Sequence, residues 1–245
     1  MMSRKTIDRD LKVFISKGYK EKLDRIYKKF PETTCAGCGV CCTDSPVITY
    51  PELLYVIDYL RNGELRDIQK KQITKNAMLE FFYGLIDPTL GCPFLDNNKR
   101  CLIHKVAPIA CKRWGLQSKE ENDQDWETDY RINKEVKAYY LKLGIELSDK
   151  VIDRKIPYCD KVTVVKNSYN FVSSDFDKEA GKIEPILFYF GDKTIENFTL
   201  CTYIAYITLG ERMFNKRIQL MRGYNSGDKE AINRFIDNIE FKSIF

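Results

Sequence analysis

The sequence predicts an α+β fold that is mostly α-helical, with cysteine-rich loops packed between helices and a small strand-containing C-terminal extension. Over most of residues 1–160, apolar side chains recur at the three- and four-residue spacing of amphipathic helices. After Pro157, short runs of β-branched and aromatic residues predict strands. The cysteines gather in glycine-containing segments without such periodicity, which indicates loops.

These observations divide the chain into two parts. Residues 1–160 are predicted to form a helical cysteine-cluster domain, and residues 161–245 a smaller α/β extension that either folds separately or belongs to the same domain. A chain of 245 residues with 44% hydrophobic and 31% charged residues can bury a core without covalent cross-links. The cysteines are therefore not required to compensate for a missing core.

The helices of the first part are marked by proline and glycine at their ends. Pro31 ends the first apolar pattern, Pro51 opens the second, and Gly63 suits the end of that second helix. Gly144 similarly follows the last helix of this part. The expected helices cover residues 10–30, 51–60, 65–83 and 128–143, and residues 84–111 are expected to be rich in loops.

The extension differs from the first part in its residue pattern. Its β-branched and aromatic runs predict short strands over residues 162–165, 169–172 and 186–190. Its remaining apolar patterns predict helices over residues 199–221 and 228–239.

A run of four cysteines within eight residues follows the first helix. Thiolates gathered so densely repel one another and oxidise easily, so a folded protein rarely keeps them unless a metal holds them. Neighbouring side chains in an extended loop point to opposite sides, so the last two cysteines either reach two metals or include one spare or structural thiol. The run consists of Cys35, Cys38, Cys41 and Cys42.

The spacing of the first three of these cysteines is that of ferredoxin-type sites, where a tight loop wraps an iron–sulfur cluster and a distant cysteine completes the set. Zinc is the alternative, because C-x2-C is also half of a four-cysteine zinc site. Zinc usually needs a second such pair, whereas the later cysteines are separated by eight and nine residues. The sequence therefore favours an iron–sulfur cluster, [4Fe–4S] in the simplest case, and leaves zinc open.

Three downstream motifs accompany the cysteine run: Gly91-Cys92-Pro93-Phe94-Leu95, Cys101-Leu102-Ile103-His104, and Pro108 three residues before Cys111. Together with the run, they resemble the CxxCxxCC family, also called the YkgJ-type cysteine cluster family and described as a putative zinc- or iron-chelating domain. The resemblance covers about residues 30–115. Cys159, which follows Ile156-Pro157-Tyr158, could extend it.

Carried over by position, the resemblance implies eight metal ligands. His104, the only histidine, could be a further ligand, a proton shuttle, a donor to sulfur or a structural residue beside the cluster. Cys201 lies in an apolar helical run and is expected to be an inert buried residue. The implied ligands are Cys35, Cys38, Cys41, Cys42, Cys92, Cys101, Cys111 and Cys159.

The chain departs from the family pattern at two places. Ala107 stands where a basic residue often precedes the proline, and Lys112 comes between Cys111 and Arg113 where arginine commonly follows directly. Some members resemble flagellin lysine N-methylases, which implies an enzymatic alternative with a pocket beside the cluster. The chain is short for that group and has no Gly-x-Gly-x-Gly loop for S-adenosylmethionine.

Composition narrows the setting in which such a centre would work. The N-terminal residues lack the apolar region of a secretory signal, and no stretch is long and apolar enough to span a bilayer, so we expect a cytoplasmic protein. In a reducing compartment, nine cysteines favour metal or redox chemistry over disulfides. A thioredoxin-like oxidoreductase is disfavoured, because the C-x2-C pair follows a helix rather than a strand.

The charge pattern does not favour nucleic acid as a partner. The net charge of +5 arises from 40 basic and 35 acidic side chains whose signs alternate along the chain. A nucleic-acid footprint needs a cleaner basic patch. The expected partner is a protein or a small molecule that the sequence does not identify.

Overall fold

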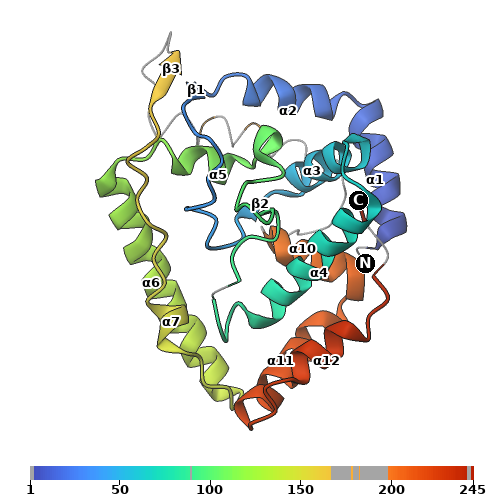
Figure 1. Ribbon diagram of the computed structural model, residues 1–245, viewed down its shortest axis with the longest axis vertical. Coiled ribbons are helices and arrows are strands. Elements are labelled where there is room, and N and C mark those ends of the chain that lie inside the picture. The colour runs from blue at the N-terminus through green and yellow to red at the C-terminus, as the bar shows by residue number, and fades with distance from the viewer. Residues whose placement is uncertain (1–2, 89, 167–177, 179–181, 183–197, 242–243) are drawn as a thin grey trace.

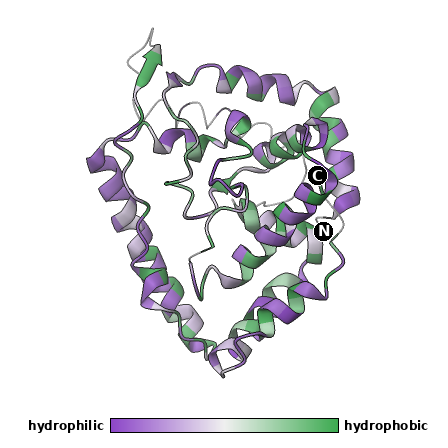
Figure 2. Cartoon of the chain, in the orientation of Figure 1, coloured by the Kyte–Doolittle hydropathy of each residue, from purple (hydrophilic) through white to green (hydrophobic). Residues whose placement is uncertain are grey.

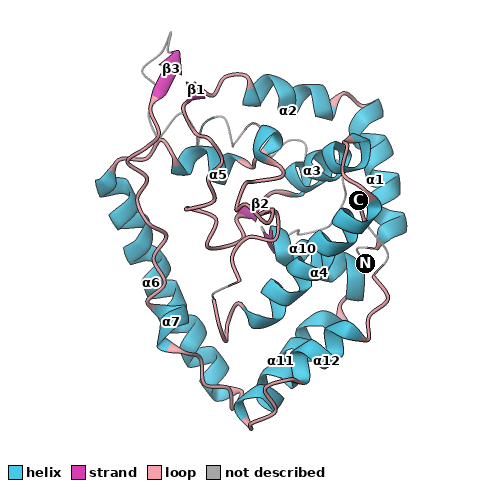
Figure 3. Ribbon diagram, in the orientation of Figure 1, coloured by secondary structure: helices cyan, strands magenta, loops and turns pink. Residues whose placement is uncertain are grey.

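The computed structural model describes residues 3–88, 90–166, 178, 182, 198–241 and 244–245 (Figure 1). Helices make up most of this part of the chain, and its strands form two small two-stranded sheets. Figure 3 shows long loops in the centre of the view with helices around them. The predicted fold class, mostly helical α+β with cysteine-rich loops between helices, is confirmed.

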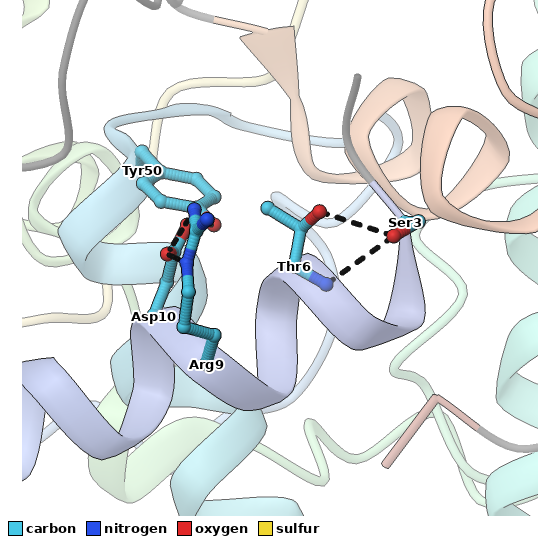
Figure 4. A network of polar contacts seen from close by, with 5 residues as sticks. All are labelled: Ser3, Thr6, Arg9, Asp10 and Tyr50. Carbon is cyan, nitrogen blue, oxygen red and sulfur yellow. Dashed lines mark hydrogen bonds and ion pairs between the residues drawn. The ribbon is translucent and has the colours of Figure 1, made fainter.

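The first predicted helix is two helices. α1 (Arg4–Ser16) begins earlier than expected because Ser3 caps it, with its Oγ accepting the Thr6 N–H at 3.2 Å (Figure 4). Gly18 then takes a φ of 70°, a left-handed conformation that separates α1 from α2 (Tyr19–Tyr27). The prediction of one continuous helix is wrong here, because the apolar spacing continues across the break.

The next two helices confirm their predictions. α3 (Tyr50–Asn62) opens with a capping box between Thr49 and Glu52 and ends before Gly63. Nearly all of its side chains are buried, so it is the central helix of the molecule. α4 (Asp67–Tyr83) follows after a short turn.

The central loops lead into α6, which is longer than predicted. It starts at Lys119 rather than at residue 128, because Ser118 and Glu121 form a capping box. The Ser118 Oγ accepts the Glu121 N–H at 3.1 Å, and the Glu121 carboxylate accepts the Ser118 N–H at 2.8 Å. The elements of this region are η1 (His104–Val106), α5 (Ile109–Trp114), α6 (Lys119–Lys142) and α7 (Asp149–Ile152).

Both sheets join the first part of the chain to the extension. β1 (Glu32–Thr33) pairs antiparallel with β3 (Val164–Lys166), and β2 (Val47–Ile48) pairs antiparallel with β4 (Phe198–Thr199). The strand predicted over residues 162–165 thus begins two residues later than expected, at Val164, and ends at Lys166. The strands predicted over residues 169–172 and 186–190 lie outside the described residues.

The C-terminal helices also differ from one prediction. α10 (Leu200–Leu209) and α11 (Arg212–Asn225) replace the single helix expected over 199–221, because Gly210 takes a φ of 69° between them. α12 (Ala231–Asp237) lies within the range expected for the last helix.

One buried apolar cluster includes side chains from both predicted parts, with α10 packed against α4. Figure 2 shows hydrophilic residues along much of α2 and hydrophobic residues in α10. The division into parts at residue 160 stays a prediction. Within the described chain, no helix combines the length and apolar character needed to cross a membrane. Members of the cluster include Phe14, Leu54, Phe81, Ile204 and Ile236.

Candidate metal centre

Three segments bring cysteines together in the centre of the fold: the loop between β1 and β2, the loop after α4, and the start of α5. Backbone hydrogen bonds hold the two loops side by side. The Cys92 N–H donates to the Cys42 carbonyl at 2.8 Å, and the Cys101 N–H donates to the Gly37 carbonyl at 3.2 Å. Leu95 and Cys101 form an isolated antiparallel bridge within the second loop.

Glycine is required where these loops meet. Gly39 has a φ of 76°, and a β-carbon there would lie 2.3 Å from the Lys99 carbonyl oxygen. Gly37 has a φ of 64°, and its β-carbon would lie 3.3 Å from the His104 ring. The sequence therefore uses glycine both for the left-handed turns and for close approach of the second loop.

The thiols of Cys41, Cys42 and Cys92 form a chain of hydrogen bonds. The hydrogen bond with Cys42, together with burial, raises the pKa of Cys41 far above its usual value. For Cys42, the hydrogen bond with Cys41 lowers the pKa, but the hydrogen bond with Cys92 and burial outweigh it and raise the pKa to about 12. These thiols are therefore protonated at neutral pH unless a metal displaces the protons.

Three more cysteines lie within electrostatic reach of that chain. Burial raises the pKa of Cys111, and the nearby thiols of Cys42, Cys101 and Cys41 raise it further. Burial is also the main cause of the raised pKa of Cys101, to which Cys41 and Cys35 contribute. Six of the eight predicted ligands thus lie within electrostatic reach of at least one other thiol of the set: Cys35, Cys41, Cys42, Cys92, Cys101 and Cys111.

The six thiols do not already form a coordination shell. Among the described residues, no three His, Cys, Asp or Glu side chains are arranged as a ready metal-binding group. Their chemistry nevertheless fits a soft metal or an iron–sulfur cluster, because thiolates are the preferred ligands of both. Binding would draw the sulfurs together and release their protons.

The other two predicted ligands lie at the edge of this group. Cys38, in the first loop, is exposed, and Cys159 is half-buried. The segment that carries Cys159 lies beside both α5 and the first loop. The Trp114 Nε1–H donates to the Pro157 carbonyl at 3.3 Å, and the Thr34 N–H, one residue before Cys35, donates to the Thr163 carbonyl at 2.9 Å.

His104 holds the first loop in place. Its Nε2 hydrogen-bonds with the Cys35 carbonyl oxygen at 3.1 Å, and its ring packs on Gly37. A ring nitrogen that donates to a carbonyl is not free to bind a metal at the same time. Of the roles that the sequence left open, this contact favours a structural residue beside the cysteines.

Glu52 is a buried residue near Cys111 that sequence reasoning did not single out. It is 4% exposed, and its Oε1 accepts the Ile109 N–H at 2.9 Å at the start of α5. The same carboxylate accepts the Tyr27 hydroxyl and both the N–H and the hydroxyl of Thr49. Glu52 thereby fixes the helix that carries Cys111 to α3. The local signal was the Thr49-x-x-Glu52 capping box.

The remaining predicted residues behave as packing and pairing groups. Cys201 is buried in α10, where its N–H donates to the Ser45 Oγ at 3.0 Å. Arg113 forms an ion pair with Asp125 at 3.7 Å. Burial lowers the pKa of Lys112, while the thiols of Cys111 and Cys35 oppose that change. All nine cysteines are free thiols.

The segment that holds most of these residues matches a known family. A family model described as CxxCxxCC, a putative zinc- or iron-chelating domain, matches residues 34–130. The match confirms the resemblance carried by the cysteine motifs and supports metal binding by this segment, with zinc and iron both allowed. It covers less than half of the 245 residues. No curated protein and no solved structure matches the chain.

Proposed function

We propose that this protein binds an iron–sulfur cluster, [4Fe–4S], through cysteine thiolates of its central loops. The observation that carries this proposal is the gathering of six thiols from three separate segments. A structural zinc ion and a [4Fe–4S] cluster each take four cysteine ligands, so the six thiols exceed what either one uses, and the C-x2-C-x2-C spacing is what favours the cluster. A cluster accompanied by further thiols, or two metal sites, accounts for the number.

Within the first loop, Cys35, Cys38 and Cys41 would hold three corners of the cluster. Their C-x2-C-x2-C spacing is that of a ferredoxin-type loop. The fourth ligand would come from Cys101 or Cys111, which lie within electrostatic reach of Cys41. When bound, such a cluster supplies electron transfer, Lewis-acid chemistry or structural cross-linking.

Zinc is the second candidate, and a specific contact favours it. The thiols of Cys41, Cys42 and Cys92 interact closely enough to shift one another's pKa values. With Cys111, they would provide the four thiolates of a closed structural zinc site. In that case the metal would serve mainly to hold the loops together.

The setting that suits either metal is a reducing one. Nine free thiols persist where disulfides are kept reduced. We therefore propose that the protein works in the cytoplasm.

Metal and sulfide analysis of protein purified without oxygen tests the proposal. A [4Fe–4S] protein contains about four iron and four acid-labile sulfide per chain and has a brown visible spectrum. Colourless protein with zinc and no sulfide would overturn the iron–sulfur proposal and support the zinc candidate. Protein that binds neither metal after reconstitution would overturn both.

Cys111, which is half-buried, and Cys201, which is buried, provide a pair of variants for locating the site. The exchange Cys111→Ser should abolish or strongly reduce metal content, because Cys111 faces the thiol group. The exchange Cys201→Ser should leave metal content unchanged, since Cys201 lies in α10 and its neighbours are Glu80 and Ser45 rather than the other thiols. Equal metal content in both variants would exclude Cys111 as a ligand.

A further inference from the structure

The first cysteine loop is open to solvent. Cys38 is exposed, and Val40, two residues further on, is 52% exposed. Cys38 is one of the predicted metal ligands, so a molecule that touches this part of the loop touches the candidate centre itself. The surface formed by these two residues and by the bordering cations Lys99, Arg100 and Lys105 is called the cysteine-loop face below.

A turn in the loop after α4 holds two of these cations against the first loop. A β-carbon on Gly39 would lie 2.3 Å from the Lys99 carbonyl oxygen, so the Lys99 backbone packs directly on the first loop. The Asp96 carbonyl accepts the Lys99 N–H at 2.9 Å, and its Oδ1 accepts the Arg100 N–H at 2.8 Å. Lys99 has a φ of 60°, a left-handed conformation that glycine adopts at lower cost. A lysine kept at such a position points to a use for its charge.

Lys105 adds a third cation to the same border. It follows His104, whose Nε2 hydrogen-bonds with the Cys35 carbonyl oxygen at 3.1 Å, so its backbone also lies next to the first loop. Within the residues that the structure describes, none of Lys99, Arg100 and Lys105 forms an ion pair, and all three are exposed.

The carboxylates of the two loops do not neutralise these cations. The only acidic residue of the first loop, residues 34–46, is Asp44, and it pairs with Arg154 at 3.4 Å. Asp96 uses its Oδ1 for the N–H groups of its own turn. Cations left without a carboxylate partner in the described chain create a positive potential, which attracts an acidic surface over a Debye length of about 10 Å at about 0.1 M salt.

The composition of the face favours a protein over a nucleic acid. Val40 supplies an exposed apolar side chain among the cations, and an apolar centre inside a polar rim is the usual anatomy of a protein interface. Residues 35–42 and 96–106 contain no Phe, Tyr or Trp on which bases could stack.

We infer that the cysteine-loop face docks an acidic protein. Carboxylates of that protein meet Lys99, Arg100 and Lys105, and its apolar surface covers Val40. The inference rests on the proposed function for the kind of protein: the partner of an iron–sulfur centre with an exposed edge is a one-electron carrier, and complexes of such carriers are small and electrostatically steered.

NMR titration of 15N-labelled flavodoxin with the full-length protein, purified without oxygen, tests the inference. Oxidised flavodoxin is an acidic one-electron carrier, and its amide shifts report binding without any electron transfer. We expect saturable shifts at about 0.01 M salt and binding at least about tenfold weaker at about 0.15 M, because the Debye length falls from about 30 Å to about 8 Å.

Charge reversal locates the contact. Arg100→Glu combined with Lys105→Glu should weaken binding at low salt by about tenfold or more, because like charges would then face each other. Both side chains are exposed, so the double variant should fold. Lys71→Glu combined with Lys142→Glu is the matched control, with the same change in net charge at exposed positions of α4 and α6, and should bind as the original protein does.

Two results would overturn the inference directly. One is the absence of saturable binding, or equal binding by the two double variants. The other is binding of a single-stranded DNA oligonucleotide in place of flavodoxin, which would assign the positive face to nucleic acid.

Metal and sulfide analysis of the same samples separates the two proposals. Protein with about four iron and four sulfide per chain that does not bind flavodoxin would overturn the docking face and leave the cluster intact. Protein with zinc and no sulfide that binds flavodoxin with the expected dependence on Arg100 and Lys105 would support the docking face and overturn the proposed iron–sulfur function.

Discussion

The helical frame of α1, α2 and α3 and the central cysteine loops treat their buried polar groups in different ways. In the frame, each such group has a partner of complementary chemistry. The Tyr50 hydroxyl donates to the Asp10 carboxylate at 2.7 Å, which also pairs with Arg9 (Figure 4). The Lys20 ammonium pairs with the Asp58 carboxylate at 2.8 Å. The carboxylates of Asp10 and Asp58 are therefore satisfied by side chains of the frame itself.

The cysteine loops lack that self-sufficiency. Their backbone depends on left-handed glycines such as Gly37 and Gly39, and their thiols pair mainly with other thiols. Sulfur is a weak hydrogen-bond donor and acceptor, so these pairs stabilise the loops little. The frame therefore determines the position of the cysteine loops, whereas a bound metal would fix the internal geometry of those loops.

Gly39→Ala has the largest expected effect on stability, and it acts on the cysteine loops. The new β-carbon would meet the Lys99 carbonyl at 2.3 Å, and the left-handed backbone would be strained as well. We expect a loss of about 3–4 kcal/mol in the free energy of unfolding, from overpacking and strain together. Denaturant unfolding and metal content measure the effect.

Gly144→Ala is the matched control for that prediction. Gly144 has almost the same φ, 74°, but no atom lies within 4 Å of a β-carbon built there. Only the strain of about 1–2 kcal/mol should remain, with metal content unchanged. Equal losses in the two variants would show that the contact between the two loops does not matter.

Glu52→Gln tests the link between the two regions. Glutamine has one acceptor oxygen, so its amide would face either the Ile109 N–H or the Thr49 N–H that the carboxylate now satisfies. We expect a loss of about 2–3 kcal/mol, typical of buried hydrogen bonds to a charged group, together with weaker metal binding. Chelator competition and denaturant unfolding measure both quantities.

The same exchange at Glu121 provides the comparison. Glu121 completes the capping box of α6 at an exposed site, where Ser118 is its partner. A glutamine oxygen can still accept the Ser118 N–H, so this exchange should remove less than about 0.5 kcal/mol and leave metal affinity unchanged. If Glu121→Gln weakened metal binding as much as Glu52→Gln, the placement of Cys111 by Glu52 would be refuted.

Local signals in the sequence predicted the frame better than the loops. Pro51 and Gly63 bounded α3 correctly, since helix ends depend on neighbouring residues. Apolar spacing did not reveal the breaks at Gly18 and Gly210, because the pattern continues through both. Propensity also missed the early start of α6, although the capping box was present in the sequence.

The candidate site was predictable in composition but not in arrangement. The cysteine spacing indicated which residues belong together, and six of the eight lie within electrostatic reach of another thiol of the set. The contact between Glu52 and Ile109 joins residues 57 positions apart, which no local pattern encodes. The contact between Gly39 and Lys99 likewise depends on how the two loops meet.

Glu80 in α4 lies outside both the frame and the cysteine loops and is a buried carboxyl with a raised pKa. Burial is the main cause that raises its pKa to about 7, with the Asp44 carboxylate adding to the shift. Because the folded state holds the proton more tightly than the unfolded state, its contribution to stability is complete below about pH 4.5 and is lost as the pH rises through 7. The Cys201 thiol and the Arg217 and Arg154 guanidinium groups lower the pKa of Glu80, but by less than burial and Asp44 raise it.

The exchange Glu80→Gln should therefore flatten the pH dependence of stability. At pH 8 the variant should exceed the original protein by roughly 2 kcal/mol, and near pH 4 the two should be equal. Urea unfolding across this range measures the difference, and Glu230→Gln at an exposed site is the control. A parallel pH profile for Glu80→Gln would contradict a proton held by the folded state.

Tyr50→Phe gives the smallest expected effect and tests the frame itself. The variant keeps the buried ring and removes one donor to Asp10, which retains its contact with Arg9. We expect a loss of about 1–2 kcal/mol in the free energy of unfolding and unchanged metal content. Tyr206→Phe, which removes an exposed hydroxyl contact with Glu211, should cost less than about 0.5 kcal/mol. If Tyr50→Phe lowered metal content, the frame and the loops would be one cooperative unit, because a hydrogen bond that involves none of the thiols would then control their arrangement.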